Sequence, residues 1–406
     1  MQYRFIKVTS FYKNFLQSYE AANPDVLTLS YDEQHRHLMS QGYGYSNYFP
    51  HYLQQNYGID GHEIIHNARH MQNAWAREHG TELSGNRLLL EQLKNYKPEI
   101  LFIQDSINFT ASFIQKIREE VGSLKLLIGH CCAPYNSENI KAFRNYNVIL
   151  ACSERFLDDF KKEEIHSYLF PHAVESSLVR QINVPPSPVN EIIFIGSLLY
   201  RNQFHKTRIS YVEEILRNKL PLKIYGQLEQ DPWHLLKMKQ AAYLGVKLLS
   251  ALNIKSILEN QTLQKTGQLT EMPRGSNYSS ILRKNCRNEP VFGLAMLERI
   301  AGYTIGFNQH AEVAGNYAAN VRMFEVSGAG TLLVTDHKKN IRSLFEPDSE
   351  ILTYKNKQEC VEKLEWAWDH PLEAKTIALA GQARALRDHS IEKRVELLHE
   401  IMRKEL

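Results

Sequence analysis

Two runs of alternating strand and helix patterns, one on each side of a proline-rich segment, constrain the fold of this 406-residue chain more than any other feature. Short apolar segments bounded by turn residues are typical of buried parallel strands, and amphipathic segments between them are typical of covering helices. The first run predicts strands over residues 99–104, 124–128, 148–151 and 168–170, with helices over 110–121 and 154–162. The second run predicts strands over 191–195, 222–225, 303–307 and 331–335, with helices over 206–217, 293–301, 358–368, 371–387 and 391–404. This alternation predicts an α/β protein with two doubly wound parallel sheets.

The proline-rich segment, Val184-Pro185-Pro186-Ser187-Pro188, sets the predicted domain organisation, because proline suits neither a helix interior nor a central strand. We expect an N-terminal domain over 1–183, a linker over 184–190, a C-terminal domain over 191–385 and a final helix over 386–406. Ligands of open α/β sheets bind beyond the carboxyl ends of the strands. Two such sheets that face each other would therefore place a site in a central cleft.

Two regions depart from the alternation. Residues up to about 96 are polar and rich in aromatic side chains, and Phe11, Phe15 and Tyr19 recur at helical spacing, so this region is expected to be helical. Residues 231–285 are expected to form a helical and polar insertion.

Composition excludes several classes of protein. A formal charge of +3 gives no concentrated basic face, so no nucleic-acid partner is expected. No apolar run reaches the length of a bilayer span, and charges occupy the start of the chain where a signal peptide needs an apolar core. We expect a cytoplasmic protein with at most peripheral contact with the inner membrane face.

The sequence offers two sets of candidate metal ligands, and we favour neither. The five cysteines have no metal-binding spacing, which indicates reduced thiols. The segment His62-Glu63-Ile64-Ile65-His66 has the spacing of a zinc protease motif if it lies on a helix. The alternative interpretation, which we favour, is an ordinary amphipathic helix with Ile64 and Ile65 facing inward. The sequence therefore predicts no metal site.

The segment from Asn308 to Asp336 carries the most specific signal for function. It reads as a polar loop, a helix, a glycine turn and a buried strand. Arg322 and Glu325 are three residues apart and so share one helix face, beside the turn formed by Gly328, Gly330 and Thr331. A cation suits phosphate oxygens and a carboxylate suits sugar hydroxyls, although such a pair is more often an ordinary surface ion pair.

This segment resembles the C-terminal half of CgeB-like glycosyltransferases, which belong to the two-domain GT-B class. The resemblance rests on the core Asn320, Arg322, Phe324 and Glu325, followed by a small-residue turn and a strand that ends in Thr335-Asp336. It implies two Rossmann-like domains facing a central cleft. It also implies transfer of a sugar from a nucleoside diphosphate to a glycan, lipid-linked or protein acceptor, as in cell-surface polysaccharide biosynthesis. No cofactor or metal is expected, because positive side chains and helix dipoles neutralise the leaving group in this class.

The resemblance assigns roles to particular residues. Arg322 and Arg201 would neutralise the diphosphate, and Glu325 would hold the ribose. The other implied donor-binding residues are Gly196, Ser197, His310, Asn316, Asn320, Gly328, Gly330 and Thr331. Lys206 and Arg208 are interpreted as a solvated basic helix start.

In the first domain, Asp105 and His130 each end a predicted strand and should point into the cleft. His130 is a candidate acceptor-side base or sugar contact. Tyr317 stands where many retaining relatives of the wider class carry a first glutamate, so the stereochemistry stays open. Two alternatives are also kept: a nucleotide-sugar epimerase, and a non-catalytic module that binds a nucleotide or a partner.

Overall fold

The computed structural model describes residues 3–183, 187–199, 205–226, 228, 233–251, 272–273, 278–287 and 289–406. The candidate Arg201, the linker residues 184–186 and most of the predicted insertion lie outside these ranges.

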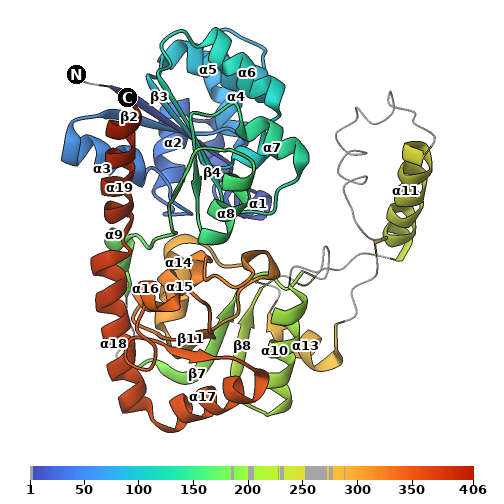
Figure 1. The fold of residues 1–406 in the computed structure, drawn as a ribbon, viewed down its shortest axis with the longest axis vertical. Helices are drawn as coiled ribbons and strands as arrows, with labels where there is room; N and C mark the ends of the chain where they lie inside the picture. The colour runs from blue at the N-terminus through green and yellow to red at the C-terminus, as the bar shows by residue number, and fades with distance from the viewer. Residues whose placement is uncertain are drawn as a thin grey trace.

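The N-terminal half folds around a six-stranded parallel sheet with the order β2-β1-β3-β4-β5-β6 (Figure 1). Its strands are β1 (Arg4–Thr9), β2 (Asp60–Ile65), β3 (Ile100–Ile103), β4 (Leu126–Cys131), β5 (Val148–Ala151) and β6 (Ser167–Leu169). The helices of this half are α1 (Lys13–Ala22), α2 (Tyr31–Met39), α3 (Tyr48–Tyr57), α4 (Arg69–Glu78), α5 (Gly85–Tyr96), α6 (Ala111–Glu120), α7 (Ser137–Phe143) and α8 (Glu154–Lys162).

A second six-stranded parallel sheet, with the order β12-β11-β10-β7-β8-β9, forms the C-terminal half. Its strands are β7 (Val189–Ile195), β8 (Leu222–Tyr225), β9 (Cys286–Arg287), β10 (Tyr303–Asn308), β11 (Leu332–Asp336) and β12 (Leu352–Tyr354). The remaining helices are α9 (Ser176–Gln181), α10 (Lys206–Arg217), α11 (Trp233–Ala251), α13 (Ser280–Asn285), α14 (Gly293–Ala301), α15 (Val321–Gly328), α16 (Ile341–Leu344), α17 (Lys357–Asp369), α18 (Pro371–Asp388) and α19 (Ile391–Glu405). Two doubly wound parallel sheets confirm the fold class predicted from the sequence.

The prediction of an all-helical N-terminal region is wrong in part, because β1 and β2 are strands of the sheet. Their sequences, RFIKVT and DGHEII, interrupt the apolar pattern with charged residues. Two of those charges, Lys7 and Glu63, are fully buried and pair with each other: the Lys7 Nζ atom lies 2.8 Å from a Glu63 carboxylate oxygen. The predicted helical stripe is present in part: Phe15 and Tyr19 are buried in α1, whereas Phe11 precedes the helix.

The chain crosses between the two halves at two adjacent segments. The Val174 N–H donates to the His389 carbonyl, and the Ile391 N–H donates to the Val174 carbonyl, each over 3.0 Å. Helix α9 precedes the predicted linker, yet its Leu178 packs in the core of the C-terminal half. Helix α19 crosses in the other direction, and its apolar face, which includes Leu398, packs against the N-terminal sheet (Figure 1).

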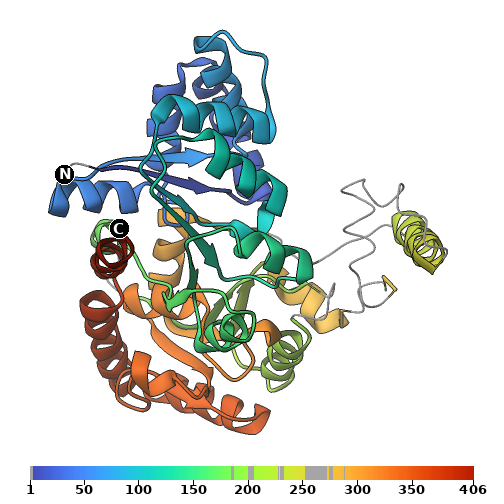
Figure 2. The same ribbon diagram turned by 45° about the horizontal axis from the view of Figure 1, so that its top comes forward.

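Helix α11 stands apart from both sheets in two views of the molecule (Figures 1 and 2). The sequence predicts a helix in this region, but the side chains of α11 are less polar than expected: Trp233, Met238, Leu244 and Leu248 are all more than half exposed. Among the described residues, no helix is both long and apolar enough to span a membrane.

Candidate active site between the two sheets

Arg322 and Glu325 lie in the first turns of α15, close to the carboxyl end of β10. The Arg322 Nη1 atom lies 2.7 Å from a Glu325 carboxylate oxygen, and the two side chains are 20% and 18% exposed. The spacing-based prediction that they share one helix face is confirmed. The pair is half-buried rather than a freely solvated surface pair, so its charges act in a setting with less solvent screening.

Tyr12 of the N-terminal half lies among charges from both halves. Its side chain is 71% exposed, yet the surrounding protein and the Asp105 carboxylate raise the pKa of its phenol, while Arg322 lowers it and Glu325 raises it. Burial raises the pKa of Tyr43 as well, with added contributions from Asp105 and Glu325. Asp105 and the Arg322–Glu325 pair therefore face the same space between the two sheets.

Asp105 belongs to a polar group at the carboxyl ends of β1, β2 and β3. One of its carboxylate oxygens accepts from the Thr9 hydroxyl over 2.9 Å and from the Ser10 N–H over 2.7 Å. The Ser10 hydroxyl in turn lies 2.7 Å from His66 Nε2. Burial lowers the pKa of His66, although Asp105 raises it, so the imidazole is neutral near pH 7. Sequence reasoning did not identify His66 as a site residue.

On the opposite side, His310 and Asp336 form a buried pair at the carboxyl ends of β10 and β11. The His310 Nδ1 atom and the Asp336 carboxylate are 2.7 Å apart, and the His310 N–H also donates to this carboxylate over 3.0 Å. Burial raises the pKa of Asp336, but His310 and Lys338 more than offset this and hold it well below its usual range. The His310 Nε2 atom is buried and makes no hydrogen bond within the described part of the chain.

Arg208 corrects one sequence interpretation. It is only 8% exposed, whereas the sequence predicts a solvated helix start, and burial lowers its pKa to about 10. Its guanidinium donates to the carbonyl of Gln309 over 2.9 Å and to that of Ser197 over 3.0 Å. Arg208 thus ties the Gly196-Ser197 turn after β7 to the loop after β10. Lys206 is exposed, as expected.

Asn320 precedes Arg322 at the start of α15 and is linked to the ends of β10 and β11 by two consecutive hydrogen bonds. The Asn320 Nδ2 group donates to Asn308 Oδ1 over 2.7 Å, and Asn308 donates to the Thr335 hydroxyl over 2.7 Å. Asn316 is exposed on the loop after β10. That loop is held from the N-terminal half by Arg155, which donates to the Val313 carbonyl over 2.5 Å.

Three predicted donor-binding residues lie at the wrong edge of the sheet. Gly328 ends α15, and Gly330 and Thr331 lie between α15 and β11, so all three sit at the amino edge, whereas Arg322 sits at the carboxyl edge. The Thr331 hydroxyl donates to the Ile300 carbonyl over 2.9 Å, and the φ angle of +79° at Gly330 marks a left-handed turn. These residues build the turn and do not face the site.

His130, the candidate base near the end of β4, is buried. Its side chain is only 4% exposed, and its Nε2 atom lies 3.0 Å from the Cys132 Sγ atom. Burial lowers the pKa of His130 to about 3. The residue does end a parallel strand, as predicted, but its ring points into the protein.

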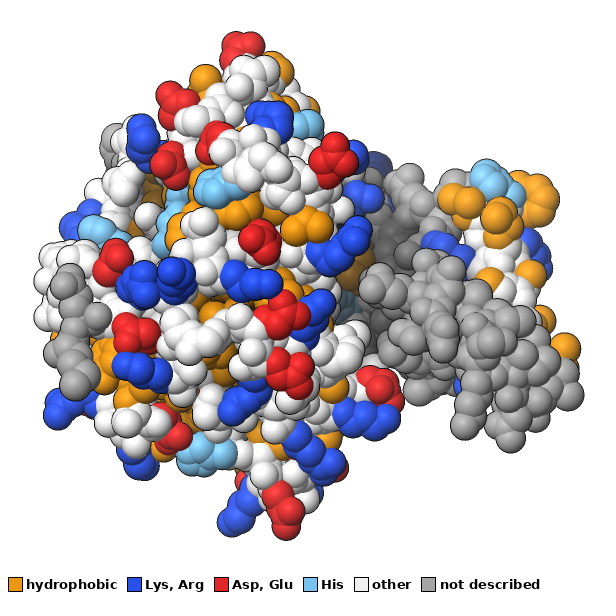
Figure 3. All heavy atoms as spheres, turned by 90° about the horizontal axis from the view of Figure 1, so that it is seen from above, with side chains coloured by type: hydrophobic (Ala, Val, Ile, Leu, Met, Phe, Trp, Pro, Cys, Tyr) orange, Lys and Arg blue, Asp and Glu red, His pale blue; other side chains and the backbone are white. Residues whose placement is uncertain are grey.

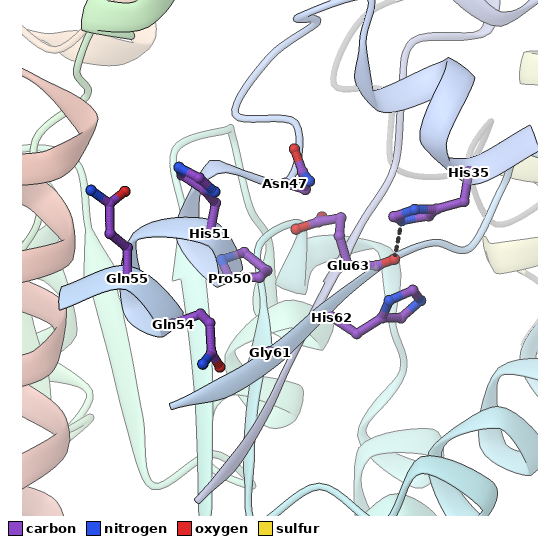
Figure 4. Close-up of a pocket in the computed structure, with 9 residues that line it drawn as sticks. All are labelled: His35, Asn47, Pro50, His51, Gln54, Gln55, Gly61, His62 and Glu63. Atoms are coloured by element: carbon purple, nitrogen blue, oxygen red, sulfur yellow. Dashed lines mark hydrogen bonds between the residues drawn. The ribbon is translucent and has the colours of Figure 1, made fainter. Parts of the chain in front are cut away.

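Residues 62–65 of the protease-like motif lie on β2 and His66 directly follows it, so both helical interpretations are wrong. Side chains at i and i+4 of a strand lie about 13 Å apart, too far to share one zinc ion. His66 contacts Ser10, whereas His62 lies in a cavity of about 420 Å³ at the outer edge of the N-terminal sheet (Figure 4). In that cavity His35 Nε2 lies 2.8 Å from the Glu63 carbonyl oxygen, away from the carboxyl ends of the strands.

Residues 251–400 match the family described as glycosyl transferase-like. No curated protein sequence matches the chain.

Three solved structures are similar over nearly the whole chain. A glycosyltransferase from Rickettsia africae is 10% identical, with a TM-score of 0.50 over 100% of this chain and 98% of that one. A sucrose-phosphate synthase from Thermosynechococcus elongatus is 9% identical, with a TM-score of 0.54 over 99% of each chain. HepE from Anabaena, in complex with UDP and glucose, is 9% identical, with a TM-score of 0.51 over 99% of this chain and 100% of that one. At such identities, the similarity establishes the fold alone.

Proposed function

We propose that this chain, which has the two-domain GT-B fold and a glycosyl transferase-like C-terminal part, transfers a sugar from a nucleoside diphosphate to a glycan, lipid-linked or protein acceptor. The observation that carries the proposal is the half-buried Arg322–Glu325 pair at the carboxyl edge of the second sheet, opposite Asp105 and Tyr12. This is where ligands of open α/β sheets bind.

Arg322 supplies the charge for the donor diphosphate. In the free protein its guanidinium is neutralised by Glu325. A bound diphosphate would take over the guanidinium, because phosphate oxygens match its planar donors. Glu325 would then accept hydrogen bonds from the ribose hydroxyls. With the buried Arg208 guanidinium nearby, we propose that the leaving group is neutralised without a metal ion.

The acceptor side is formed by the Asp105 group. Attack on the donor sugar requires removal of a proton from the acceptor hydroxyl. Asp105 and the neutral imidazole of His66 are titratable groups that follow β3 and β2 at this edge of the N-terminal sheet, and Ser10 contacts both. We assign the base to this group in place of His130.

Donor binding tests the proposal directly. We expect one nucleotide among UDP, GDP, CDP, dTDP and ADP to raise the unfolding temperature, with UDP as the first candidate because HepE binds it. The shift should not depend on magnesium. It should be lost in Arg322→Ala. It should be kept in Arg342→Ala, because that control removes the same charge from an arginine that is 72% exposed in a surface ion pair.

Two further arms separate the alternatives. The Glu325→Gln variant should bind ribose and deoxyribose nucleotides equally well if the Glu325 carboxylate of the wild type holds the ribose. Nucleotide binding without transfer to any acceptor would favour a non-catalytic module, and epimer formation without an acceptor would favour an epimerase. No stabilisation by any nucleotide would contradict the proposal.

We also propose that α11 brings this otherwise cytoplasmic protein to an anionic membrane surface. The helix exposes Trp233, Met238 and Leu248, and Figure 3 shows apolar side chains of this helix open to solvent. It contains three lysines and no acidic residue. Lysines attract anionic headgroups and the apolar side chains enter the interface.

Vesicle binding tests this location. The full chain should cosediment with vesicles of phosphatidylglycerol and phosphatidylcholine but not with phosphatidylcholine alone. Trp233→Ser with Met238→Ser should weaken binding at least several-fold. Exposed Leu372→Ser on α18 serves as the matched control. Equal binding by the double variant would exclude α11 as the contact.

A further inference from the structure

Four thiol and imidazole groups converge at the carboxyl ends of β4, β5 and β6. Cys132 follows β4, Cys152 follows β5 and His172 follows β6. One ligand atom from each of these three residues lies within 4.8 Å of the other two. His130, the fourth, ends β4 with its Nε2 atom 3.0 Å from the Cys132 Sγ atom. Its ring is perpendicular to that of His172, at 89° and 6.1 Å between centroids.

The outer nitrogen of His172 already has a partner that turns its inner nitrogen toward the thiols. The Tyr45 hydroxyl lies 2.5 Å from His172 Nδ1. The backbone of Gln104 lies beside the His130 ring, whose Nε2 atom faces Cys132. Partners of this kind fix the tautomer and orientation of histidines that ligate metals.

We propose that Cys132, Cys152, His172 and His130 bind one zinc ion. Two thiolates and two imidazoles are a common tetrahedral donor set for structural zinc, and soft thiolates disfavour magnesium and calcium. With Zn–S of about 2.3 Å and Zn–N of about 2.0–2.1 Å, ligand atoms of such a site lie roughly 3.3–3.8 Å apart. Three of the ligand atoms are already within 4.8 Å of one another, and His130 Nε2 lies 3.0 Å from one of them, the Cys132 Sγ atom, so rotations of the side chains would bring the four to this geometry. Binding releases the two thiol protons to solvent.

Four protein ligands leave no open position, so the zinc is structural. It would join the ends of three strands beside the segments that cross between the two halves. Arg394 of α19 donates to the carbonyls of Pro171 and His172, over 2.8 and 3.3 Å. The metal would thus fix the strand ends against the crossing helix. This role is separate from metal-free sugar transfer at the Arg322 site.

Metal analysis of the full chain tests the proposal. Untagged protein, purified without chelator, should contain one zinc per chain and release it to a thiol-blocking mercurial. Replacement with Co²⁺ should give the strong visible absorption of tetrahedral cobalt and a thiolate charge-transfer band. Cys152→Ser should lose both, whereas Cys286→Ser, which changes a half-buried thiol on β9, should keep them. His130→Gln should change the visible bands and retain charge transfer.

The wild-type protein alone can overturn the proposal, even if the cysteine variants fail to fold. Failure of the reduced chain to take up either Zn²⁺ or Co²⁺ would do so. So would a cobalt spectrum without thiolate charge transfer, or a Cys132–Cys152 disulfide in place of metal in freshly purified protein.

Discussion

Replacing Arg322 with alanine should lower kcat of sugar transfer by about 10²–10³-fold, the typical loss when one preorganised group that stabilises transition-state charge is removed. The guanidinium is the charge placed at the carboxyl edge of the second sheet, next to Glu325 and opposite Asp105. Charge on the diphosphate grows as the glycosidic bond breaks, so kcat should fall, and KM for the donor should rise as well because the same guanidinium holds the bound diphosphate. Steady-state kinetics with a saturating donor measure it.

The matched variants separate charge from geometry and from folding. Arg322→Lys keeps the charge but not the planar donors, so it should recover only part of the rate. Arg342→Ala should be as active as the wild type. The unfolding temperature of Arg322→Ala should stay close to that of the wild type, because a pair this close to solvent contributes about 1 kcal/mol or less. Full activity in Arg322→Ala would remove this residue from the mechanism.

Much of the fold could be predicted because local and tertiary preferences agree. The apolar runs of β5 and β8 and the amphipathic helices α8, α10 and α14 have the predicted bounds. The strands β1 and β2 could not be predicted, because Lys7 and Glu63 break the apolar pattern that marks a parallel strand. Only the pairing of two distant strands makes these charges compatible with burial, and local patterns contain no information on that pairing.

The same cause explains the errors in the candidate site. Residues after predicted strands, such as Asp105, lie at the predicted edge. Ser10 and His66 could not be predicted as site residues because β1 and β2, the strands that precede them, were not predicted. The helical interpretation of residues 62–66 also places His66 on a helix instead of at the end of a strand. Gly328 and Gly330 are close to Arg322 in sequence but not in space, because they lie at the opposite end of α15 from Arg322.

The thiol and imidazole cluster shows which sequence signal could have found it. Its ligands have no metal-binding spacing, because they come from three different strands. Each of them, however, follows a predicted strand within four residues. Carboxyl ends of neighbouring parallel strands meet at one edge of a sheet. Grouping cysteines and histidines by the strand they follow, instead of by spacing, would have brought these four residues together.

Replacing Lys7 with methionine should destabilise the protein at pH 9, where Glu63 is ionised, by about 3–5 kcal/mol, the usual result of leaving one partner of a buried ion pair alone. Lys7 and Glu63 are paired positions on β1 and β2, and both side chains are 0% exposed. The Lys7 ammonium lies 2.8 and 3.0 Å from the two Glu63 oxygens. Urea unfolding monitored by circular dichroism measures the change, and Lys125→Met, which breaks a solvent-exposed pair with Glu99, is the control.

The pH dependence and a double variant identify the cause of this loss. Burial raises the pKa of Glu63 to about 8 even though Lys7 lowers it. The folded protein therefore holds a proton that the unfolded chain releases above about pH 4.3, so this group's contribution to stability falls as pH rises from there to 8. Without Lys7 the pKa of Glu63 in the folded protein rises further, and its contribution to stability continues to fall beyond pH 8. The loss of stability in Lys7→Met should therefore be larger at pH 9 than at pH 6. Adding Glu63→Leu should restore much of the stability and flatten this profile, because no carboxylate is left to bury. An equal deficit at both pH values, or no recovery in the double variant, would mean that lost packing and not the unpaired charge destabilises the sheet.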